Sequence, residues 1–377
     1  MILKNAVIMD GSFNLQKADV SVNEEKISSI GEAHERGECF DLNGLFVVPG
    51  FVDIHIHGCA GADTCDGTRS SISKMAAHLV TCGVTSFCPT TMTVPMEEIE
   101  TAIGTVQECM KNPPDGAAVR GVNMEGPYIS PDRIGAQKGD CVRKPDAKEF
   151  QRLCEKHEGV VKLVDIAPEV DGAEELVKYA RKVCCVSLAH SMADYETAKE
   201  SFGWGITHAT HLFNAMNGLK HRTPGAVGAV FDDDRIRAEL ICDGFHIHPA
   251  VLRTAFRLLG ENRSIVISDS MRAAGLADGD YDLGGQTVHV NGCHALLADG
   301  TIAGSTTNLG QEVKNLLGFG VPLKQVIKSA TTNPAREIGA DKEIGSIEVG
   351  KKADFVVLDS SLNIKMVFTG GKIAYRC

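Results

Sequence analysis

Two histidines one residue apart follow an apolar run that crosses a Pro49-Gly50 turn. Alternate residues of a β-strand point to the same face, so His55 and His57 are expected to point together. Two imidazoles on one face can hold one metal ion. A three-residue motif is short, and a pair of histidines without function at a strand end is the alternative. The rest of the chain decides between the two.

Apolar runs alternate with helical patterns through the middle of the chain. The runs predict eight strands, at residues 52–57, 84–88, 119–124, 161–167, 184–189, 206–211, 238–242 and 265–268. The helical patterns between them include residues 70–82, 95–110, 173–183, 195–202 and 249–260. Eight βα units predict a (β/α)8 TIM-like barrel of the α/β class, whose active site lies at the carboxyl ends of the strands. A doubly wound open sheet is the structural alternative, but no Gly-x-Gly-x-x-Gly turn follows the first strand.

Residues of metal-binding type lie at the ends of six of these strands. They are His55 and His57, Glu125, His190, His208 and His211, Asp243, and Asp269. Taken singly, each has an ordinary alternative as a buried histidine, a capping aspartate or an exposed glutamate. Imidazoles and carboxylates bind Zn²⁺, Fe²⁺ and similar ions, which lower the pKa of bound water and polarise carbonyl groups. The pattern therefore predicts a metal-dependent hydrolase site.

Both ends of the chain have a different pattern from the middle. Short alternating apolar runs in residues 1–46 and 345–377 are typical of small antiparallel strands, and neither end has enough of them alone. We expect residues 1–48 and 345–377 to form one small β-sandwich domain beside a barrel of residues 49–344.

Composition excludes several classes of protein. The 377 residues carry a formal net charge of −11, which argues against nonspecific nucleic-acid binding. No run approaches the roughly 20 apolar residues of a membrane span. The 13 cysteines are scattered rather than spaced as a disulfide framework, and the chain starts directly with a predicted strand. These features predict a cytoplasmic protein that does not associate with membranes.

Longer motifs carry a resemblance over about residues 1–370. The sequence resembles the amidohydrolase superfamily and, within it, the N-acetylglucosamine-6-phosphate deacetylases. The first motif below is typical of the whole superfamily, whereas Glu-Gly-Pro and His-Leu-Phe-Asn-Ala-Met are more specific. The motifs are Pro49-Gly50-Phe51-Val52-Asp53-Ile54-His55-Ile56-His57-Gly58, Met124-Glu125-Gly126-Pro127-Tyr128, Leu188-Ala189-His190, Thr207-His208-Ala209-Thr210-His211-Leu212-Phe213-Asn214-Ala215-Met216 and Ser268-Asp269-Ser270-Met271.

The resemblance implies a metal centre. It implies that Glu125, His190 and His211 bind the ion common to the family. Because His55 and His57 are both present here, a second ion is expected, with Asp269 near it. His208 is left out of the ligands because it can point into the barrel wall. Zn²⁺ or Fe²⁺ is expected, with Mn²⁺ or Co²⁺ as alternatives.

Asp269 is the predicted general base and acid. A carboxylate beside the metal can take a proton from bound water and, after hydroxide attacks the acetamide carbonyl, deliver it to the departing amine. A role as a metal ligand alone is the alternative.

The resemblance also implies residues that bind a sugar phosphate. Arg222 and His246 would bind the phosphate, and an arginine suits this because its guanidinium can make two parallel hydrogen bonds. A solvated loop arginine is the alternative. Many relatives have histidine where this chain has Gln137, so the contact there differs. The remaining predicted contacts are Ala136, Asn214, Ala215, Asp243, Gly244, Phe245, Ile302, Ala303 and Gly304.

The leading hypothesis is a deacetylase that releases acetate from N-acetyl-D-glucosamine 6-phosphate. The same reaction on the galactosamine epimer is an alternative, because inversion of one hydroxyl leaves the metal site and the phosphate contacts unchanged. A noncatalytic barrel that serves as a scaffold is a third reading, against which the complete ligand set argues. The resemblance further implies a homodimer in which a neighbouring subunit supplies part of the phosphate site.

Overall fold

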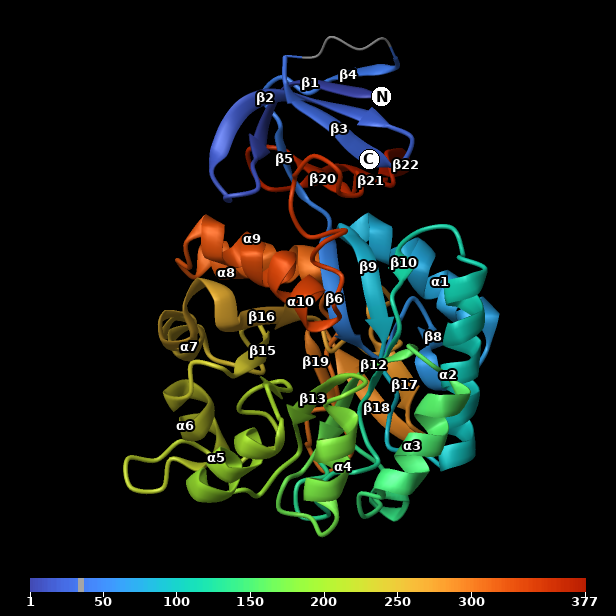
Figure 1. Cartoon of the computed structure of the whole chain (residues 1–377), viewed down its shortest axis with the longest axis vertical. Coiled ribbons are helices and arrows are strands. Elements are labelled where there is room, and N and C mark those ends of the chain that lie inside the picture. The colour runs from blue at the N-terminus through green and yellow to red at the C-terminus, as the bar shows by residue number, and fades with distance from the viewer. Residues whose placement is uncertain (33–36) are drawn as a thin grey trace.

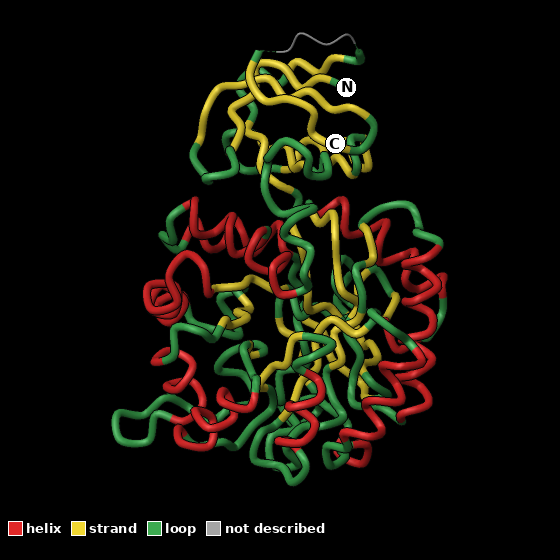
Figure 2. The backbone as a smooth tube through the Cα atoms, in the orientation of Figure 1, coloured by secondary structure: helices red, strands yellow, loops and turns green. Residues whose placement is uncertain are grey.

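The computed structural model describes residues 1–32 and 37–377. Figure 1 shows two parts: a β-sheet that carries both chain ends, and a larger part in which strands and helices alternate. In Figure 2 the smaller part consists of strands and loops, and the helices gather in the larger part. This arrangement agrees with the α/β class predicted from the sequence.

The smaller part is a single sheet to which both ends of the chain contribute. Its strand order is β22–β21–β20–β5–β1–β2–β3, and β4 also pairs with β1. Strand β5 pairs with β1 on one side and with β20 on the other, where Val48 lies opposite Val356. Because β5 pairs with an N-terminal strand and with a C-terminal strand, the strands of the two chain ends form one continuous sheet. They do not form the two facing sheets of the predicted sandwich. The strands are β1 (Ile2–Met9), β2 (Leu15–Asn23), β3 (Lys26–Gly31), β4 (Cys39–Asp41), β5 (Phe46–Pro49), β20 (Phe355–Leu358), β21 (Ile364–Thr369) and β22 (Lys372–Arg376).

The larger part contains two parallel sheets, with orders β10–β9–β6 and β11–β12–β13–β14–β15–β16. All eight predicted strands have counterparts, although the third is divided where Gly121 adopts a φ of 144°, which residues with a side chain rarely reach. The sixth is reduced to two paired residues, and the backbone at His211 is left-handed. The strands are β6 (Phe51–Ile56), β9 (Val84–Pro89), β10 (Ala118–Val119), β11 (Val122–Met124), β12 (Val161–Ile166), β13 (Cys185–Leu188), β14 (His208–Ala209), β15 (Arg237–Ile241) and β16 (Ser264–Ile267).

Backbone hydrogen bonds connect the two parallel sheets at both junctions. The N–H of Thr91 after β9 donates to the carbonyl oxygen of Asn123 in β11 at 3.0 Å. The N–H of Asp269 after β16 donates to the carbonyl oxygen of His55 in β6 at 2.9 Å. Since the strands run in parallel, side chains that follow their carboxyl ends are brought to one place.

Helices connect the strands, and several begin with a side-chain cap. Asp146 accepts hydrogen bonds from the N–H groups of Lys148 and Glu149 at the start of α3, and Asp194 accepts one from Thr197 in α5. Such caps satisfy N–H groups that the first turn leaves free. The helices are α1 (Arg69–Leu79), α2 (Met96–Lys111), α3 (Ala147–Lys156), α4 (Ala173–Ala180), α5 (Tyr195–Trp204), α6 (Gly225–Asp232), α7 (Pro249–Arg263), α8 (Leu309–Gly318), α9 (Leu323–Ala330) and α10 (Thr332–Glu337). Within the described residues, no helix has both the length and the apolar character needed to cross a membrane.

Several short elements complete the larger part. A three-stranded antiparallel sheet follows β16, and Gln286 within it donates a side-chain hydrogen bond to the carbonyl oxygen of Ala136 at 2.7 Å. This bond ties the inserted sheet to the loop after β11. The elements are β17 (Gly279–Leu283), β18 (Gln286–Asn291), β19 (His294–Leu296), the β7 (Gly58–Cys59) and β8 (Ala62–Asp63) pair, and the 3₁₀ helices η1 (Thr64–Asp66), η2 (Val80–Cys82) and η3 (Gly139–Cys141).

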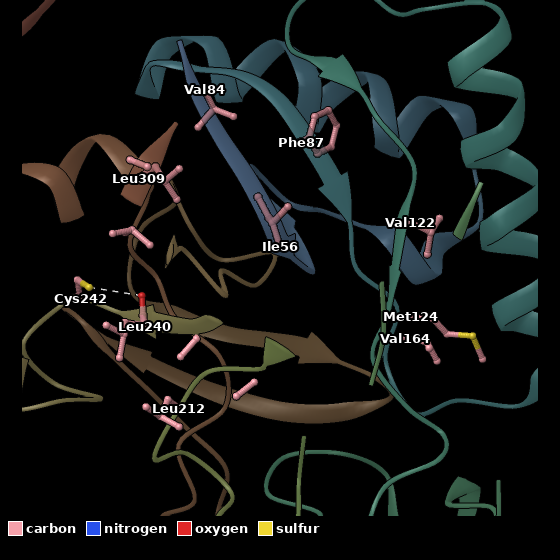
Figure 3. Packing of buried hydrophobic residues seen from close by; sticks show 14 of the residues in the cluster. Ile56, Val84, Phe87, Val122, Met124, Val164, Leu212, Leu240, Cys242 and Leu309 are labelled. Atoms are coloured by element: carbon pink, nitrogen blue, oxygen red, sulfur yellow. Dashed lines mark hydrogen bonds between the residues drawn. The ribbon is translucent and has the colours of Figure 1, made fainter. Parts of the chain in front are cut away.

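Buried apolar side chains pack around the parallel strands. Figure 3 shows Ile56 of β6, Phe87 of β9 and Leu240 of β15 in this cluster, and all three are fully buried. Burying a side chain of this size contributes about 1.5–3 kcal/mol. The packed cluster therefore holds the strand ends, and the polar residues that follow them, in fixed positions.

Candidate active site

Six polar side chains converge at the carboxyl ends of the parallel strands. His55 is in β6 and His57 follows it, and Glu125 comes directly after β11. Three further residues each lie two positions beyond the end of β13, β14 or β16, namely His190, His211 and Asp269. All six are buried. The structure thus brings together all six residues that the sequence analysis assigned to a metal centre.

Glu125 lies between two pairs of histidines. Its Oε1 is 2.8 Å from Nε2 of His190 and 3.1 Å from Nε2 of His211. Its Oε2 is 3.0 Å from Nε2 of His57 and 3.5 Å from Nε2 of His55. Each carboxylate oxygen therefore faces a different histidine pair, so Glu125 belongs to both groups of candidate ligands.

Asp269 also faces the first histidine pair, His55 and His57. Its Oδ1 is 3.2 Å from Nε2 of His57 and 3.5 Å from Nε2 of His55. The carboxylate thus lies beside one of the two candidate ion positions. Asp269 also lines the cavity at this site, so its carboxylate can contact a molecule bound there.

The outer ring nitrogens of three of these histidines are already occupied. Nδ1 of His190 donates to the carbonyl oxygen of Arg133 at 2.8 Å, and Nδ1 of His57 donates to the carbonyl oxygen of Thr90 at 3.3 Å. Nδ1 of His55 lies 2.9 Å from a carboxylate oxygen. Because carbonyl and carboxylate oxygens only accept, the Nδ1 atoms carry the protons. Each Nε2 lone pair is then free to point inward as a ligand.

The backbone is left-handed at three of the site residues. His190, His211 and Asp269 have φ values of 44°, 28° and 46°. Residues with a side chain rarely adopt this conformation, which costs roughly 1–3 kcal/mol and persists where the surrounding structure enforces it. The sharp turns at the strand ends place His190 and His211 against Glu125, and Asp269 against His57.

The donor atoms fit divalent metal ions. His55, His57 and Glu125 form one group whose ligand atoms lie within 4.8 Å of one another, and Glu125, His190 and His211 form a second. Among the described residues, Nε2 of His55 and Oε2 of Glu125 are buried atoms without a hydrogen-bond partner. Two buried acceptor atoms that face each other at 3.5 Å without a shared proton are suited to a common cation.

Both carboxylates are held in the ionised form. Burial alone would raise the pKa of Glu125, but the neighbouring imidazoles of His190, His211 and His55 stabilise the ionised carboxylate and hold the pKa well below 4.5. For Asp269, burial is likewise outweighed, chiefly by the adjacent imidazole of His57, so its pKa is lowered. An ionised Asp269 is able to accept a proton.

A cavity of about 250 Å³ opens above these groups. His57, Glu125 and Asp269 lie in its wall together with His190 and His211. Seven of the predicted sugar-phosphate contacts also line it: Ala136, Gln137, Asn214, Ala215, His246, Ile302 and Gly304. Thus most of the predicted substrate residues surround one space directly above the candidate metal centre.

Besides Arg222, four predicted contacts do not line this cavity, namely Asp243, Gly244, Phe245 and Ala303. Asp243 turns back on its own loop, where Oδ1 accepts from the N–H groups of Phe245 and His246, and Oδ2 accepts from Nδ1 of His246 at 2.7 Å. Gly244 is part of this turn, and Ala303 is fully buried. Asp243 and Gly244 therefore shape the loop that carries His246. Ala303 lies between Ile302 and Gly304, which line the cavity in its place.

Arg222 lies outside the cavity. It is exposed and lines a separate surface pocket together with Arg133 and Lys220. Within one chain, Arg222 and His246 therefore do not share a pocket, and the sequence alone did not reveal this separation. A single subunit does not assemble both parts of the predicted phosphate site.

Other residues of the site were missed or underestimated in the sequence. Met92, Leu283 and Thr301 line the cavity from loops without a recognisable motif. Gln137 is buried, and its Oε1 accepts a hydrogen bond from the N–H of Thr93 at 2.6 Å, which fixes its position. Glu239, the partner of Nδ1 of His55, did leave a signal, since it is a charged residue within the apolar strand 238–242.

Comparison with known protein families agrees with this geometry. Residues 46–374 match the amidohydrolase family. The chain belongs to this family. The family suggested by the sequence motifs is thereby confirmed.

Curated relatives match nearly the whole chain. An N-acetylglucosamine-6-phosphate deacetylase of Bacillus subtilis is 34% identical over 100% of this chain and 97% of its own length. An N-acetylgalactosamine-6-phosphate deacetylase of Escherichia coli O157:H7 is 36% identical over 86% of this chain and 87% of its own length.

Solved structures of this amidohydrolase's relatives have the same fold. The N-acetylglucosamine-6-phosphate deacetylase of Thermotoga maritima aligns with a TM-score of 0.90 at 33% identity and covers 100% of both chains. A mutant of the Mycobacterium smegmatis enzyme in complex with N-acetyl-D-glucosamine 6-phosphate aligns with a TM-score of 0.93 at 29% identity, over 99% of each chain.

Proposed function

We propose that this amidohydrolase hydrolyses the acetamide of N-acetyl-D-glucosamine 6-phosphate to give acetate and D-glucosamine 6-phosphate. The observation that carries the proposal is the position of Glu125, each of whose oxygens faces a separate histidine pair at the base of the cavity. The full-length similarity to deacetylases of this substrate supports the choice of substrate.

The chain's residues are suited to hold two divalent ions. His55, His57, Glu125 and Asp269 would hold one, and Glu125, His190 and His211 the other. Ions bound there would polarise the acetamide carbonyl and lower the pKa of a water molecule. Zn²⁺ or Fe²⁺ is the proposed ion, with Mn²⁺ or Co²⁺ as alternatives, because imidazole and carboxylate ligands suit all four.

Asp269 is the proposed general base and acid. Its carboxylate is ionised and lies at the cavity wall, so it can accept the proton of the attacking water. The proton held on Oδ1 is then available to the amine nitrogen when the C–N bond breaks. The backbone N–H of Asp269 donates to the carbonyl oxygen of His55 at 2.9 Å, which keeps Asp269 at the site.

The sugar would occupy the cavity above the metal centre. Ala136, Gln137, Asn214, Ala215, His246, Ile302 and Gly304 line this space and are the proposed sugar contacts. We assign Asp243, Gly244, Phe245 and Ala303 a supporting role behind these contacts. Arg222 is the proposed phosphate ligand, acting in a neighbouring subunit.

A homodimer would bring the phosphate site together. Arg222 is exposed in a pocket separate from the cavity that His246 lines, and a second subunit offers a way to join the two. We further propose that the enzyme works in the cytoplasm. All 13 cysteines lie in the described part of the chain and are free thiols, as a reducing compartment favours.

The two parallel sheets act in this proposal as one closed (β/α)8 barrel, which is supported by the hydrogen bonds at both junctions. The proposed domain boundaries are residues 49–344 for the barrel and residues 1–48 with 345–377 for the small β domain. The pairing of β5 with β20, close to these boundaries, supports the division.

The galactosamine epimer is the second candidate substrate. The relative that acts on N-acetylgalactosamine 6-phosphate is 36% identical, which is no less than the identity to the deacetylases of the glucosamine compound. A noncatalytic scaffold is not favoured, because all six candidate metal-site residues are present and converge.

Acetate release with both epimers tests the proposal. Purified protein is treated with a chelator and then reloaded separately with each of the four ions. We expect activity to disappear on chelation, to return with Zn²⁺ or Fe²⁺, and to be faster with the glucosamine compound. Faster release from the galactosamine compound would favour the second candidate. Release from neither compound by metal-loaded protein would refute both.

A further inference from the structure

A buried glutamate lies behind the candidate metal centre. Glu239 is in the middle of β15 and fully buried, between the apolar neighbours Ala238 and Leu240. Burying a carboxylate is costly unless other groups pair with it or hydrogen-bond to it. The partners of Glu239 therefore indicate what its burial achieves.

One oxygen of Glu239 contacts both groups of candidate ligands. Oε2 lies 2.9 Å from Nδ1 of His55 and accepts a hydrogen bond from the backbone N–H of His211 at 3.2 Å. Nδ1 and Nε2 lie on different sides of the imidazole ring, so this contact leaves Nε2 of His55 directed at Glu125. A single carboxylate oxygen thus links the ligand group of His55 to that of His211.

The second oxygen of Glu239 faces a row of acidic and basic groups, of which His208 and Glu337 are buried and Arg237 is half-buried. Oε1 of Glu239 is 3.1 Å from Nε2 of His208, whose Nδ1 is 3.1 Å from Oε2 of Glu337. Glu337 in turn pairs with the guanidinium of Arg237. Acidic and basic groups alternate along this row, which limits the cost of burying each charge.

We propose that Glu239 is a positioning residue that sets the geometry of the metal centre, and that His208 and Glu337 hold Glu239 in place. The inference rests on the metal site proposed above. Histidine ligands commonly donate their other ring N–H to a carboxylate, and replacing that partner typically lowers metal affinity or activity about 10–100-fold. Glu239 is the carboxylate partner of Nδ1 of His55, and it also accepts a hydrogen bond from the backbone N–H of His211.

A third metal site is the competing explanation for part of this row. Cys185, His208 and Glu337 have ligand atoms within 4.8 Å of one another. However, Oε2 of Glu337 accepts a hydrogen bond from Sγ of Cys185 at 3.4 Å, and Arg237 already places a positive charge on this carboxylate. A nearby guanidinium disfavours a further cation, so the row acts as support for Glu239.

Metal binding without substrate tests the proposal. The proteins compared are the wild type, Glu239→Ala, Glu239→Gln and the control Glu312→Gln. Glu312 is also a fully buried glutamate but makes no contact with the metal centre in any described hydrogen bond or ion pair. Each protein is stripped of metal and titrated with Zn²⁺ against a chromophoric chelator. Visible spectra are then recorded after loading with Co²⁺.

We expect Glu239→Ala to bind at least one Zn²⁺ ion about 10–100-fold more weakly and to have an altered Co²⁺ spectrum. Glu239→Gln keeps one acceptor oxygen, so it should show a smaller loss in the same direction. Glu312→Gln should match the wild type. Circular dichroism of the metal-free proteins shows whether each variant is folded. If Glu239→Ala is unfolded, the Zn²⁺ affinity of Glu239→Gln tests the proposal instead.

Wild-type Zn²⁺ affinity and an unchanged Co²⁺ spectrum in the folded Glu239 variants would overturn the proposal. An equal loss in Glu312→Gln would also overturn it, because any buried carboxylate would then matter. A third Zn²⁺ equivalent that disappears in His208→Asn would replace the supporting role of the row with a metal site. Because no sugar is used, these outcomes do not depend on which substrate the enzyme hydrolyses.

Discussion

The imidazole of His57 and the carboxylate of Asp269 face each other across the junction of the two parallel sheets, with 3.2 Å between Nε2 and Oδ1. The two residues follow the first and the last of the parallel strands, β6 and β16. Their contact depends on the curvature that brings these strands together, where the N–H of Asp269 also donates to the carbonyl oxygen of His55.

Replacement of Asp269 by asparagine should lower kcat by about 10²-fold or more, because general acid–base catalysis commonly contributes that much. Asparagine retains an oxygen that can face a metal ion but cannot carry the proton. We therefore expect metal content, measured by elemental analysis, to stay near that of the wild type. Near-normal turnover at full metal content would rule out Asp269 as the general base.

Reconstituted protein should contain two metal ions per chain. A double replacement of His55 and His57 by alanine should leave one ion, because Glu125, His190 and His211 still form the second group. Elemental analysis, after removal of loosely bound metal, measures the number of metal ions per chain in the wild type and in the double variant. A single equivalent in the wild type would show that the first histidine pair serves the substrate or the fold instead.

Arg222→Ala should raise KM strongly for the phosphorylated sugar and hardly change the turnover of unphosphorylated N-acetylglucosamine. The reason is that the guanidinium is the proposed ligand of the phosphate and has no role at the acetamide. Arg152→Ala, which removes another exposed arginine from α3, is the matched control and should behave as the wild type. Equal losses on both sugars would indicate that Arg222 supports the fold.

Mixing subunits tests whether the phosphate site is shared. If Arg222 of one subunit meets His246 of the other, a mixture of Arg222→Ala and His246→Ala proteins should recover activity after subunit exchange, since some mixed dimers contain one intact site. Neither protein alone should gain activity under the same treatment. Absence of recovery in dimers shown to have exchanged would place both residues in the same subunit's site.

Glu312→Gln should make the protein more stable at alkaline pH relative to the wild type. Burial raises the pKa of Glu312 well above 4.5, so the folded state holds a proton that the unfolded state releases. Wild-type stability therefore falls as pH rises above the unfolded pKa of about 4.3. Glutamine resembles the neutral acid and lacks this dependence. Denaturant unfolding at pH 5 and pH 8 measures the effect, and parallel pH profiles for the two proteins would contradict it.

The sequence by itself predicted the residues that converge at the candidate metal centre. The spacing of His55 and His57, and the positions of Glu125, His190, His211 and Asp269 after apolar runs, depend on strand periodicity and on the parallel direction of the strands. Strand periodicity is a local property, and the parallel direction follows from the alternation of strands with helices along the chain, which is why a single sequence reveals both. The alternating runs at both chain ends likewise predicted strands correctly, although not that β5 would join them into one sheet.

Only the tertiary structure decided which side chains meet. The separation of Arg222 from His246 and the row from Glu239 to Arg237 depend on how segments far apart in the chain pack together. The turn of Asp243 depends on hydrogen bonds within its own loop. Neither periodicity nor motif spacing encodes the direction of a loop or the partner of a buried charge. Loop directions and the partners of buried charges follow from packing. For example, the unfavourable free energy of burying Glu239 is offset only when His55 and His208 pack against it.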